Sequence, residues 1–333
     1  MLTCVLLWSA AANSSLFTLH SSLSIFHSSL IKAQSFTLVE LNCENLFDAR
    51  HDSLKQDQEY LPDGTRHWTR GRYWQKVNAI GQEILSASDS LPDLVALVEV
   101  ENDSVLRTLT RRSLLSRAGY QYLMTSSPDV RGLDVALLYL PRRFTPLCYE
   151  SIAVPLTADQ RPTRDILYIK GVIGSVDTLH FYVVHAPSRF GGERQTRLRR
   201  LQVAHVLVEH MQTLGFQARV VVAGDFNDYA DSPSLQYLYR QGLANVTADA
   251  RGRHGGARGT YRFRGEWRSI DHVLTSPRLA ARVDSVYIHD APFLLENDDR
   301  YGGRKPRRTF QGYRYQPPGF SDHLPLVVCF SAE

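Results

Sequence analysis

The sequence predicts a single α/β domain that begins after the first 35 residues. Its composition is typical of a globular protein, because 43% of the 333 residues are hydrophobic and 22% are charged. Short apolar runs alternate along the chain with segments in which apolar residues recur at helical spacing. No repeat, low-complexity block or Gly/Ser-rich linker divides residues 36–333. These observations exclude a coiled coil, a disordered chain and a collagen-like repeat.

The predicted elements follow one another as strands with helices between them. The first strand covers Phe36–Leu41 and stops where the polar Asn42 follows. A helix is predicted over Trp74–Leu85, and the next strand, Leu94–Val98, is an apolar run that suits burial on both faces and ends at Glu99. Further strands are predicted at Val135–Leu140, Ile166–Val172, Phe181–Val184, Val220–Ala223, Ile270–Leu274 and Pro325–Phe330. Helices are predicted at 194–214 and 232–241.

The first 35 residues are composed differently from the rest of the chain. They are rich in Leu, Ser, Ala and Phe, and Lys32 is their only Lys or Arg. Leu2–Ala12 resembles the apolar core of a secretory signal and Ala10–Ala12 resembles a cleavage site, although the basic start of such a signal is missing. We therefore expect residues 1–35 to be a leader and the protein to be periplasmic or secreted. The alternative is an extended N-terminus on a cytoplasmic protein.

Cysteine content, charge and hydropathy narrow the class of protein further. Cys4, Cys43, Cys148 and Cys329 match neither a zinc site nor a disulfide framework by spacing, so we expect buried, unreactive thiols. The net charge of +4, from 38 Lys and Arg against 34 Asp and Glu, is too small to name a polyanionic partner. After the leader no apolar stretch reaches the ~18 residues that a membrane-spanning helix needs.

Several predicted strands end in a polar residue that is able to take part in catalysis. These residues are Asn42, Glu99, His185 and Asp225. In α/β proteins, ligands gather at the carboxyl ends of strands. A single polar residue at a strand end is usually a cap or a turn former, but four of them, followed by two Asp–His pairs, predict a site.

Each strand-end motif has a chemical interpretation and an ordinary structural one. Glu99 offers oxygen ligands to Mg²⁺, or it belongs to a helix start in which Glu101–Asp103 open the next helix. Gly224 permits a tight turn from which Asp225 and Asn227 orient a water and a phosphoryl oxygen, or the segment is an Asx-rich turn. His185 either donates to a phosphoryl oxygen or is a satisfied structural histidine.

The two Asp–His pairs, Asp271–His272 and Asp322–His323, resemble parts of a general acid/base dyad. Neighbouring residues of an extended strand face opposite sides, so Asp322 is not expected to orient His323. Asp271 is the expected partner of His323, which leaves Asp322 free to approach a metal. The alternative is that each pair is a solvated turn at a strand edge.

In combination these motifs resemble the endonuclease/exonuclease/phosphatase superfamily. The similarity covers residues 36–330 and rests on six segments in the expected order: Asn42, Leu97–Val100, Val184–His185, Gly224–Asn227, Ser269–His272 and Ser321–Pro325. It implies a four-layer α/β sandwich of two mixed β-sheets flanked by helices, which periodicity alone does not distinguish from a doubly wound sheet. It also implies metal-dependent hydrolysis of phosphodiester bonds, with Mg²⁺ or Mn²⁺ as the cofactor.

The same resemblance assigns a role to each matching residue. It makes His323 the catalytic histidine, oriented by Asp271, and Arg131 a contact of the substrate phosphate. It places three residues at the metal and three more around the scissile phosphate. The metal residues are Glu99, Asn42 and Asp322, and the residues around the phosphate are His185, Asp225 and Asn227.

Two stretches rich in Arg and aromatic residues precede the Asp–His motifs, at 251–268 and 300–315. Such stretches suit phosphate contacts and base stacking, and they supply Arg264 and Arg308 as candidate substrate contacts; the alternative is two solvated loops. We therefore expect a monomeric nuclease that acts on DNA or RNA. The alternatives are a phosphatase or sphingomyelinase-like phosphodiesterase acting on inositol phosphates or phospholipids, and a binding module without catalysis.

Overall fold

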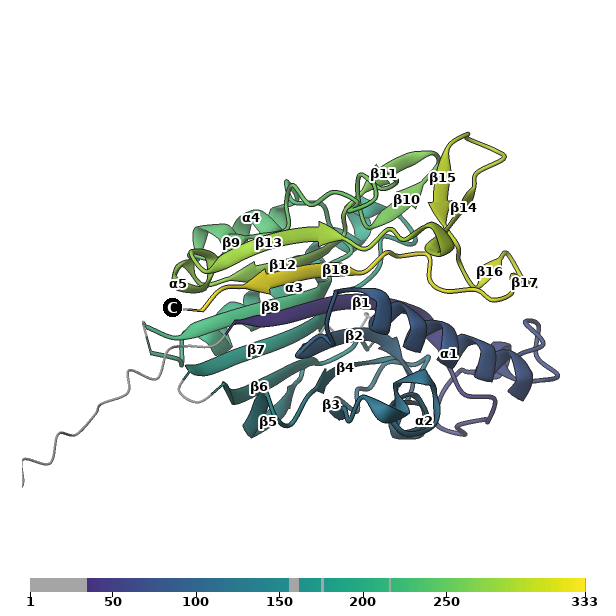
Figure 1. Cartoon of the computed structure of the whole chain (residues 1–333), viewed down its shortest axis with the longest axis horizontal. Helices are drawn as coiled ribbons and strands as arrows, with labels where there is room; N and C mark the ends of the chain where they lie inside the picture. Colours follow the sequence, from purple (N-terminus) through teal and green to yellow (C-terminus); the bar gives the residue numbers. More distant parts are fainter. Residues whose placement is uncertain (1–34, 156–161, 175–176, 216, 333) are drawn as a thin grey trace, which may run out of the picture. The chain divides into compact units, whose positions relative to one another are not determined.

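Two six-stranded mixed sheets with helices on their outer faces form the domain (Figure 1). The computed structural model describes residues 35–155, 162–174, 177–215 and 217–332. The predicted leader, apart from Ser35, and Cys4 lie outside these residues. The predicted four-layer α/β sandwich is thus confirmed.

The first sheet has the strand order β13-β18-β1-β2-β4-β3. Only β1 and β2 pair in parallel, and the other neighbours are antiparallel. Its strands are β1 (Phe36–Leu46), β2 (Leu94–Val100), β3 (Gln121–Met124), β4 (Asp134–Tyr139), β13 (Val283–Ile288) and β18 (Leu326–Phe330).

The second sheet has the order β5-β6-β7-β8-β12-β9, and here only β7 and β8 are parallel. Its strands are β5 (Phe144–Ile152), β6 (Ile166–Ile173), β7 (Asp177–His185), β8 (Arg219–Asp225), β9 (Ala244–Asn245) and β12 (Asp271–Thr275). The α-helices are α1 (Arg70–Ser86), α2 (Asp103–Arg112), α3 (Glu193–Met211), α4 (Pro233–Arg240) and α5 (Pro277–Ala280). Short 3-10 helices cover Gln58–Tyr60, Leu114–Arg117 and Pro292–Leu294.

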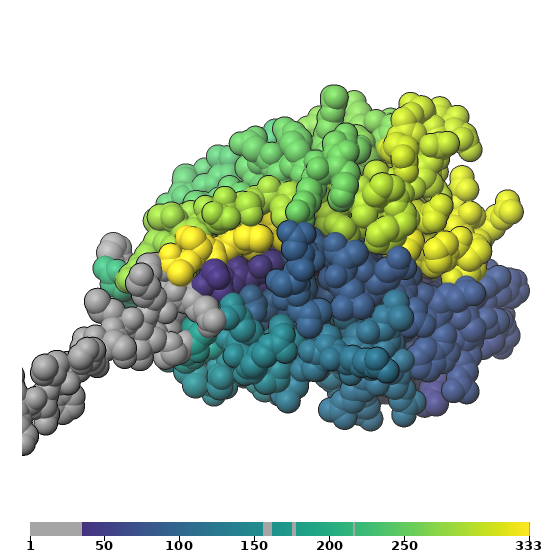
Figure 2. Space-filling model, in the orientation of Figure 1, coloured from purple at the N-terminus to yellow at the C-terminus, as the bar shows by residue number. Residues whose placement is uncertain are grey.

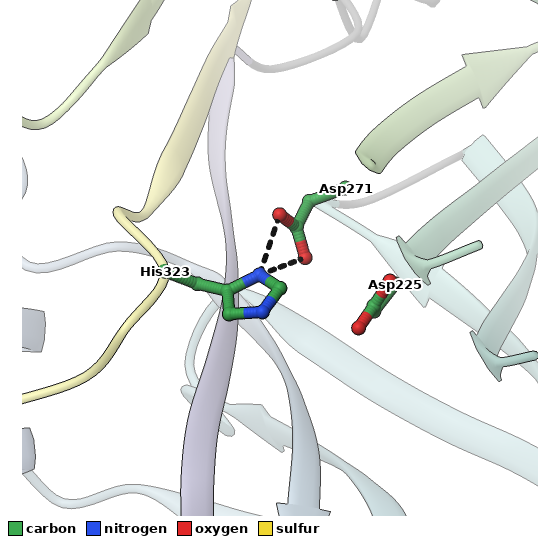
Figure 3. A group of neighbouring side chains, drawn as sticks. All are labelled: Asp225, Asp271 and His323. Carbon is green, nitrogen blue, oxygen red and sulfur yellow. Dashed lines mark hydrogen bonds and ion pairs between the residues drawn. The ribbon is translucent and has the colours of Figure 1, made fainter. Parts of the chain in front are cut away.

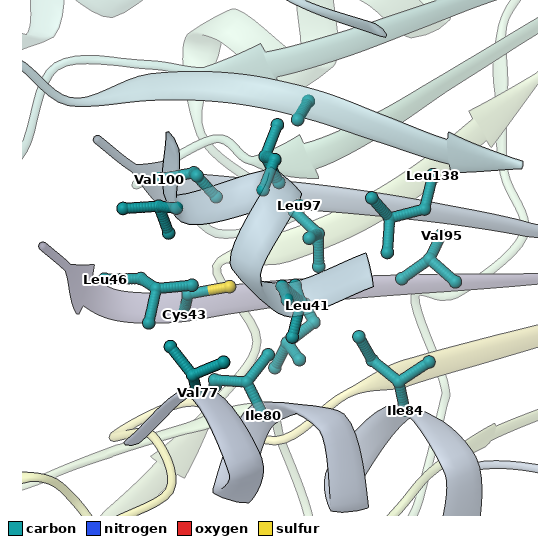
Figure 4. Packing of buried hydrophobic residues seen from close by; sticks show 14 of the residues in the cluster. Leu41, Cys43, Leu46, Val77, Ile80, Ile84, Val95, Leu97, Val100 and Leu138 are labelled. Carbon is teal, nitrogen blue, oxygen red and sulfur yellow. The ribbon is translucent and has the colours of Figure 1, made fainter. Parts of the chain in front are cut away.

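Alternating side chains place the hydrophobic core in three layers. On β1, Val39 and Leu41 face the helices α1 and α2, whereas Leu38 faces the second sheet. Figure 4 shows Val77 and Ile80 of α1 packed toward the strands of the first sheet. A third cluster joins α3 and α4 to the outer face of the second sheet. Both sheets are therefore buried on two faces, as their continuous apolar runs require.

Three small hairpins occupy the C-terminal part of the domain: β10 (Tyr261–Phe263) with β11 (Glu266–Arg268), β14 (Leu295–Asn297) with β15 (Arg304–Pro306), and β16 (Phe310–Gln311) with β17 (Arg314–Tyr315). The β16–β17 hairpin packs on the segment before α1. There the Arg66 guanidinium lies 4.8 Å from the Phe310 ring and donates to Gly312 O at 3.2 Å. Figure 2 shows the yellow C-terminal surface lying against the blue surface of this earlier segment.

The structure corrects some of the sequence-based expectations. β1 does not stop at Asn42 but continues to Leu46 through an irregularity at Glu44 and Asn45, whose φ angles are 47° and 56°. The strand β5 was not predicted, because it is an edge strand with mostly exposed side chains. Cys148 is exposed and Cys329 is half-buried, so the expectation of buried thiols holds only for Cys43 among the described cysteines, which form no disulfide. No helix in the described ranges is long and apolar enough to cross a membrane.

Candidate active site

Polar residues at or next to the ends of four strands meet Asn42, which lies within β1, at one edge of the two sheets. In the second sheet, the parallel register of β7 and β8 pairs His185 with Asp225, and the antiparallel register of β8 and β12 pairs Asp225 with Asp271. From the first sheet, the Nδ2 nitrogen of Asn42 donates to Oδ2 of Asp225 at 3.1 Å. Glu99, at the end of β2, lies 3.7 Å from His185. Residues far apart in the sequence thus form one polar site.

His323 and Asp271 form a buried hydrogen-bonded pair (Figure 3). The Nδ1 nitrogen of His323 lies 2.8 Å and 3.0 Å from the two Asp271 oxygens, and Thr260 also donates to Asp271. Burial lowers the pKa of His323, but the charge and hydrogen bond of Asp271 outweigh it and hold the pKa well above its ordinary value. The protonated form of His323 is therefore favoured, and Nδ1 is the nitrogen that faces Asp271. Its Nε2 nitrogen lies 3.9 Å from Asp322.

Asp225 is held by donors on two sides. It accepts from the backbone N of Asn227 at 2.7 Å and from the Asn227 amide at 3.3 Å, in addition to Asn42. Burial, followed by the nearby charge of Asp271, raises the pKa of Asp225 to about 8. Gly224 has φ +145, and a Cβ there would lie 1.9 Å from Val184 O, so only glycine fits where β8 turns Asp225 into the site.

Glu99 presents a carboxylate with one uncommitted oxygen. Its Oε2 accepts from the backbone N of Asn45 at 2.8 Å, and no hydrogen bond from the described residues reaches Oε1. The Nε2 nitrogen of His185 lies 3.7 Å from Oε1, and burial and the cations around it hold the pKa of His185 well below its ordinary value. Glu99 also has φ 63, in the left-handed region that non-glycine residues rarely adopt. The Oε1 oxygen, with no hydrogen bond from the described residues, fits a hard divalent cation.

Asp322 and Arg308 lie in an ion-pair network with Glu44, a residue that the motifs did not single out. Arg308 Nη2 donates to Asp322 Oδ2 at 3.0 Å and to Glu44 Oε1 at 3.2 Å. The other Glu44 oxygen accepts from the backbone N of Thr309 at 2.6 Å. Arg308, predicted to bind substrate, thus neutralises two carboxylates of the site itself, and one of them is the predicted metal residue Asp322.

A second arrangement of potential ligands lies at Asp225, Asp271 and His323, whose ligand atoms are within 4.8 Å of one another (Figure 3). In this group, however, Asp271 and the Nδ1 nitrogen of His323 are already bonded to each other. Binding an ion through that nitrogen would break the pair. Glu99, with its uncommitted oxygen, is the better match for a cation among the described residues.

Arg131 and Arg264, both expected to contact substrate, lie in different surroundings. Arg131 is close enough for its charge to contribute to the lowered pKa of His185, and it lies 3.9 Å from Asp129. Arg264 is exposed at the turn of the β10–β11 hairpin, with its guanidinium 5.1 Å from the Phe263 ring. Neither forms a hydrogen bond or ion pair with another predicted site residue among those described.

Sequence reasoning missed two further buried residues that act on the site. Arg164 donates to Ala186 O at 2.9 Å and to Asp129 at 3.2 Å, and its charge lowers the pKa of the neighbouring His185. Glu40, whose two carboxylate oxygens have no hydrogen-bond partner, is completely buried. Burial, then Asp271 and Asp225, raise its pKa well above the ordinary value. Glu40 could have been noticed in the sequence as the one charged residue in the apolar run 36–41. Arg164 could not, because no motif surrounds it.

Solved structures of several other proteins have a similar fold. An endonuclease/exonuclease/phosphatase family protein from Bacteroides thetaiotaomicron has a TM-score of 0.60 at 17% identity, over 89% of this chain and 97% of that one. A humanized D. rerio TDP2 has a TM-score of 0.56 at 17% identity, over 89% of this chain and 99% of that one. A Bacteroides thetaiotaomicron mannosyl-6-phosphatase has a TM-score of 0.54 at 17% identity, over 88% and 98%.

At this level of identity the structural similarities establish the fold alone. No curated protein matches the chain. A family model, in contrast, matches residues 37–332 and so includes both sheets and every strand-end residue of the site. By this match, the chain belongs to the endonuclease/exonuclease/phosphatase family.

Proposed function

We propose that this protein is a Mg²⁺-dependent phosphodiesterase that cleaves nucleic acid. Membership of the family supports a phosphoester hydrolase. The observation that carries the finer proposal is the meeting, at one edge of the sheets, of the His323–Asp271 pair, the Asp225–Asn227 turn and the uncommitted oxygen of Glu99. These groups supply a fixed cation, a proton acceptor and an anionic ligand, which are the three elements that phosphoester hydrolysis requires.

His323 acts as the fixed positive charge of the reaction. Asp271 holds Nδ1, so that Nε2 is the nitrogen left to donate to a phosphoryl oxygen as negative charge builds up there. Because the ring is already oriented before substrate binds, little reorganisation is needed in the transition state. Asp271 is a positioning residue in this scheme, since it reaches the substrate only through His323.

Asp225 orients the attacking water or moves a proton to or from it. Its Oδ2 oxygen is held by the amides of Asn42 and Asn227, which fix the direction of the carboxyl group. The Asn227 amide is itself anchored on Ala186 O at 3.0 Å. These hydrogen bonds fix the orientation of the Asp225 carboxyl group, as general acid/base catalysis requires.

Glu99, together with Asn42 and Asp322, would hold the divalent ion. Such an ion supplies charge neutralisation at the phosphoryl oxygen. Carboxylate and amide oxygens are the ligands that Mg²⁺ prefers, and Mn²⁺ accepts the same set. The Oδ1 oxygen of Asn42 accepts from the backbone N of Glu44 at 2.8 Å, which leaves its second lone pair for an ion.

A nucleic-acid substrate is supported by the Arg- and aromatic-rich hairpins that precede Asp271 and Asp322 in the chain. One of the similar folds is a TDP2, whereas another is a mannosyl-6-phosphatase, which keeps a phosphomonoester as the second candidate. We also propose that the protein is exported through its N-terminal leader and acts as a monomer.

A substrate panel tests the proposed function. Single-stranded and duplex DNA, RNA, an inositol polyphosphate, a sugar 6-phosphate and sphingomyelin are incubated with the full chain, with Mg²⁺ and with a chelator. The proposal expects Mg²⁺-dependent cleavage of at least one nucleic acid. Preference for the sugar phosphate or the inositol polyphosphate would instead establish a phosphatase, and hydrolysis of sphingomyelin would establish a lipid phosphodiesterase.

A further inference from the structure

Three side chains form a stack beside the site edge of the second sheet, two of them on loops and Arg268 at the end of β11. Arg189 lies four residues beyond His185, Tyr229 lies two beyond Asn227, and Arg268 lies three before Asp271. Because β7, β8 and β12 are neighbours in the sheet (Figure 1), their loops emerge together at the edge that carries the catalytic groups. The stack therefore lies beside the strand ends that carry the proposed catalytic groups.

Both arginines contact the same aromatic ring. The guanidinium carbon of Arg189 lies 4.3 Å from the centroid of the Tyr229 ring, and that of Arg268 lies 5.0 Å from it. Cation–π contacts of this kind orient a guanidinium without neutralising its charge. Two positive charges are thus held close together on one tyrosine.

The carboxylates near the stack are paired with other arginines, and Arg189 acts on them only through its charge, without an ion pair among the described residues. Asp228 is paired with Arg200 at 2.7 Å, and Glu193 accepts from Arg197 at 2.8 Å. The single ion pair of Arg268 is a loose one, 3.8 Å from a Glu266 side chain that is 75% exposed. In the described part of the chain, the Nη1 nitrogen of Arg189 is buried and has no hydrogen-bond partner.

Other arginines around the site differ from this pair, because they support the protein itself. Arg308 bridges Glu44 and Asp322, and Arg164 bonds to Asp129. Arg262 bonds to Asp298 at 3.1 Å and to the carbonyl of Gly302 at 2.7 Å, so it ties two hairpins together. Arg189 and Arg268 therefore retain the donors that a ligand would use.

We propose that Arg189, Tyr229 and Arg268 bind a second phosphate of the substrate strand, next to the scissile one. Guanidinium groups match phosphate oxygens with paired N–H donors, and two of them beside one ring form an anion site on the path of a polyanion. Phe190, which is 92% exposed beside Arg189, is available to stack on a base. This inference rests on the proposed phosphodiesterase function and adds to it that the preferred substrate carries consecutive phosphodiesters.

The experiment compares substrates that differ by one phosphate. Thymidylyl-thymidine has a single phosphodiester, whereas the corresponding trinucleoside diphosphate has a second one. Hydrolysis of both is measured for the wild type, Arg189→Gln, Arg268→Gln and the double variant. Arg112→Gln is the matched control, because Arg112 is an exposed arginine on α2, on the outer face of the other sheet.

The wild type is expected to prefer the trinucleoside diphosphate. Each Arg→Gln change should raise KM for that substrate about tenfold, the effect of losing one charge-assisted hydrogen bond. On a longer single strand, each should also reduce the salt slope of binding by ~0.7. Turnover of thymidylyl-thymidine should stay at the wild-type rate, which also shows that each variant is folded. Arg112→Gln should leave both substrates unaffected.

Three results separate failure of this inference from failure of the proposed function. In the first, the wild type hydrolyses both substrates while the double variant and the control Arg112→Gln have the same KM for the trinucleoside diphosphate. That result would overturn the second-phosphate site but leave the proposed phosphodiesterase function intact. A wild type that prefers the single phosphodiester would overturn the site equally. If the wild type hydrolyses no phosphodiester at all, the proposed function is wrong and the inference falls with it.

Discussion

The Nδ1 nitrogen of His323 lies 2.8 Å from the Oδ2 oxygen of Asp271, with both side chains buried. The two residues are 52 positions apart in the sequence, on β12 and just before β18. This contact fixes which nitrogen of the histidine faces the site. The first prediction follows from it.

Replacing His323 by Gln should reduce the rate of phosphodiester hydrolysis by at least ~10²-fold, because the fixed positive charge on the phosphoryl oxygen is lost. Asp271→Asn should reduce kcat less than His323→Gln and leave KM nearly unchanged, since Asp271 acts only through the ring. Steady-state measurement of kcat and KM for both variants on one phosphodiester substrate tests this difference. A rate near wild type for His323→Gln would remove that residue from the mechanism.

Glu99→Gln should weaken the binding of Mn²⁺, because the amide offers a single neutral oxygen where the carboxylate offered a charged one. The free ion signal in electron paramagnetic resonance measures binding directly, without reference to activity. Glu209→Gln is the matched control, since Glu209 is exposed on α3, outside the site. Equal Mn²⁺ affinity in Glu99→Gln and the control would place the ion elsewhere, with the Asp225–Asp271–His323 group as the next candidate.

Arg308→Met should make the stability of the fold depend more strongly on Mg²⁺. Without Arg308, Glu44 and Asp322 face each other with no counter-charge, and we expect a loss of about 1–2 kcal/mol, a value reduced because the Arg308 side chain is 41% exposed. A bound cation should restore part of that loss. Thermal unfolding in chelator and in Mg²⁺ measures both effects. A Mg²⁺-induced shift in Tm no larger than that of the wild type would contradict the prediction.

Glu83→Gln should stabilise the protein at alkaline pH and have little effect at acidic pH. Glu83 is buried with both carboxylate oxygens unpartnered, and burial, offset in part by Lys76, raises its pKa from 4.5 to about 8. Because the folded-state pKa is the higher one, wild-type stability falls as the pH rises from about 4.5 to about 8, while the unfolded chain ionises and the folded one does not.

Urea unfolding at the two ends of that pH range measures the difference between wild type and Glu83→Gln. The gain from the substitution should grow toward the upper end, to the order of a few kcal/mol. A difference that is the same at both pH values would mean that Glu83 is ionised in the folded protein. Glu83 lies on α1, so this test probes the core and does not depend on the proposed activity.

Much of the site was predictable from the sequence because its residues end apolar strands. Glu99, His185 and Asp225 each follow a buried run, and the strand order then brings them together. The partner of His323 was predictable from side-chain alternation, since Asp322 and His323 face different directions in an extended segment. These inferences needed only local periodicity and the rule that strand ends gather ligands.

Other parts required the tertiary structure. Glu44 lies in an irregular turn of β1 with φ 47, where alternation no longer tells which way a side chain points. Arg308 was predicted to bind substrate because it lies in a basic stretch, but its pairing with two acidic residues depends on long-range packing. Edge strands such as β5 escape detection because one of their faces is solvated and carries no apolar run.

The most direct test of the central claim is hydrolysis of a single-stranded oligonucleotide by the purified full chain, followed before and after removal of divalent ions. The account predicts cleavage with Mg²⁺, loss of cleavage when a chelator is added, and recovery when Mg²⁺ is returned in excess. Cleavage that continues at the same rate in the chelator would contradict it.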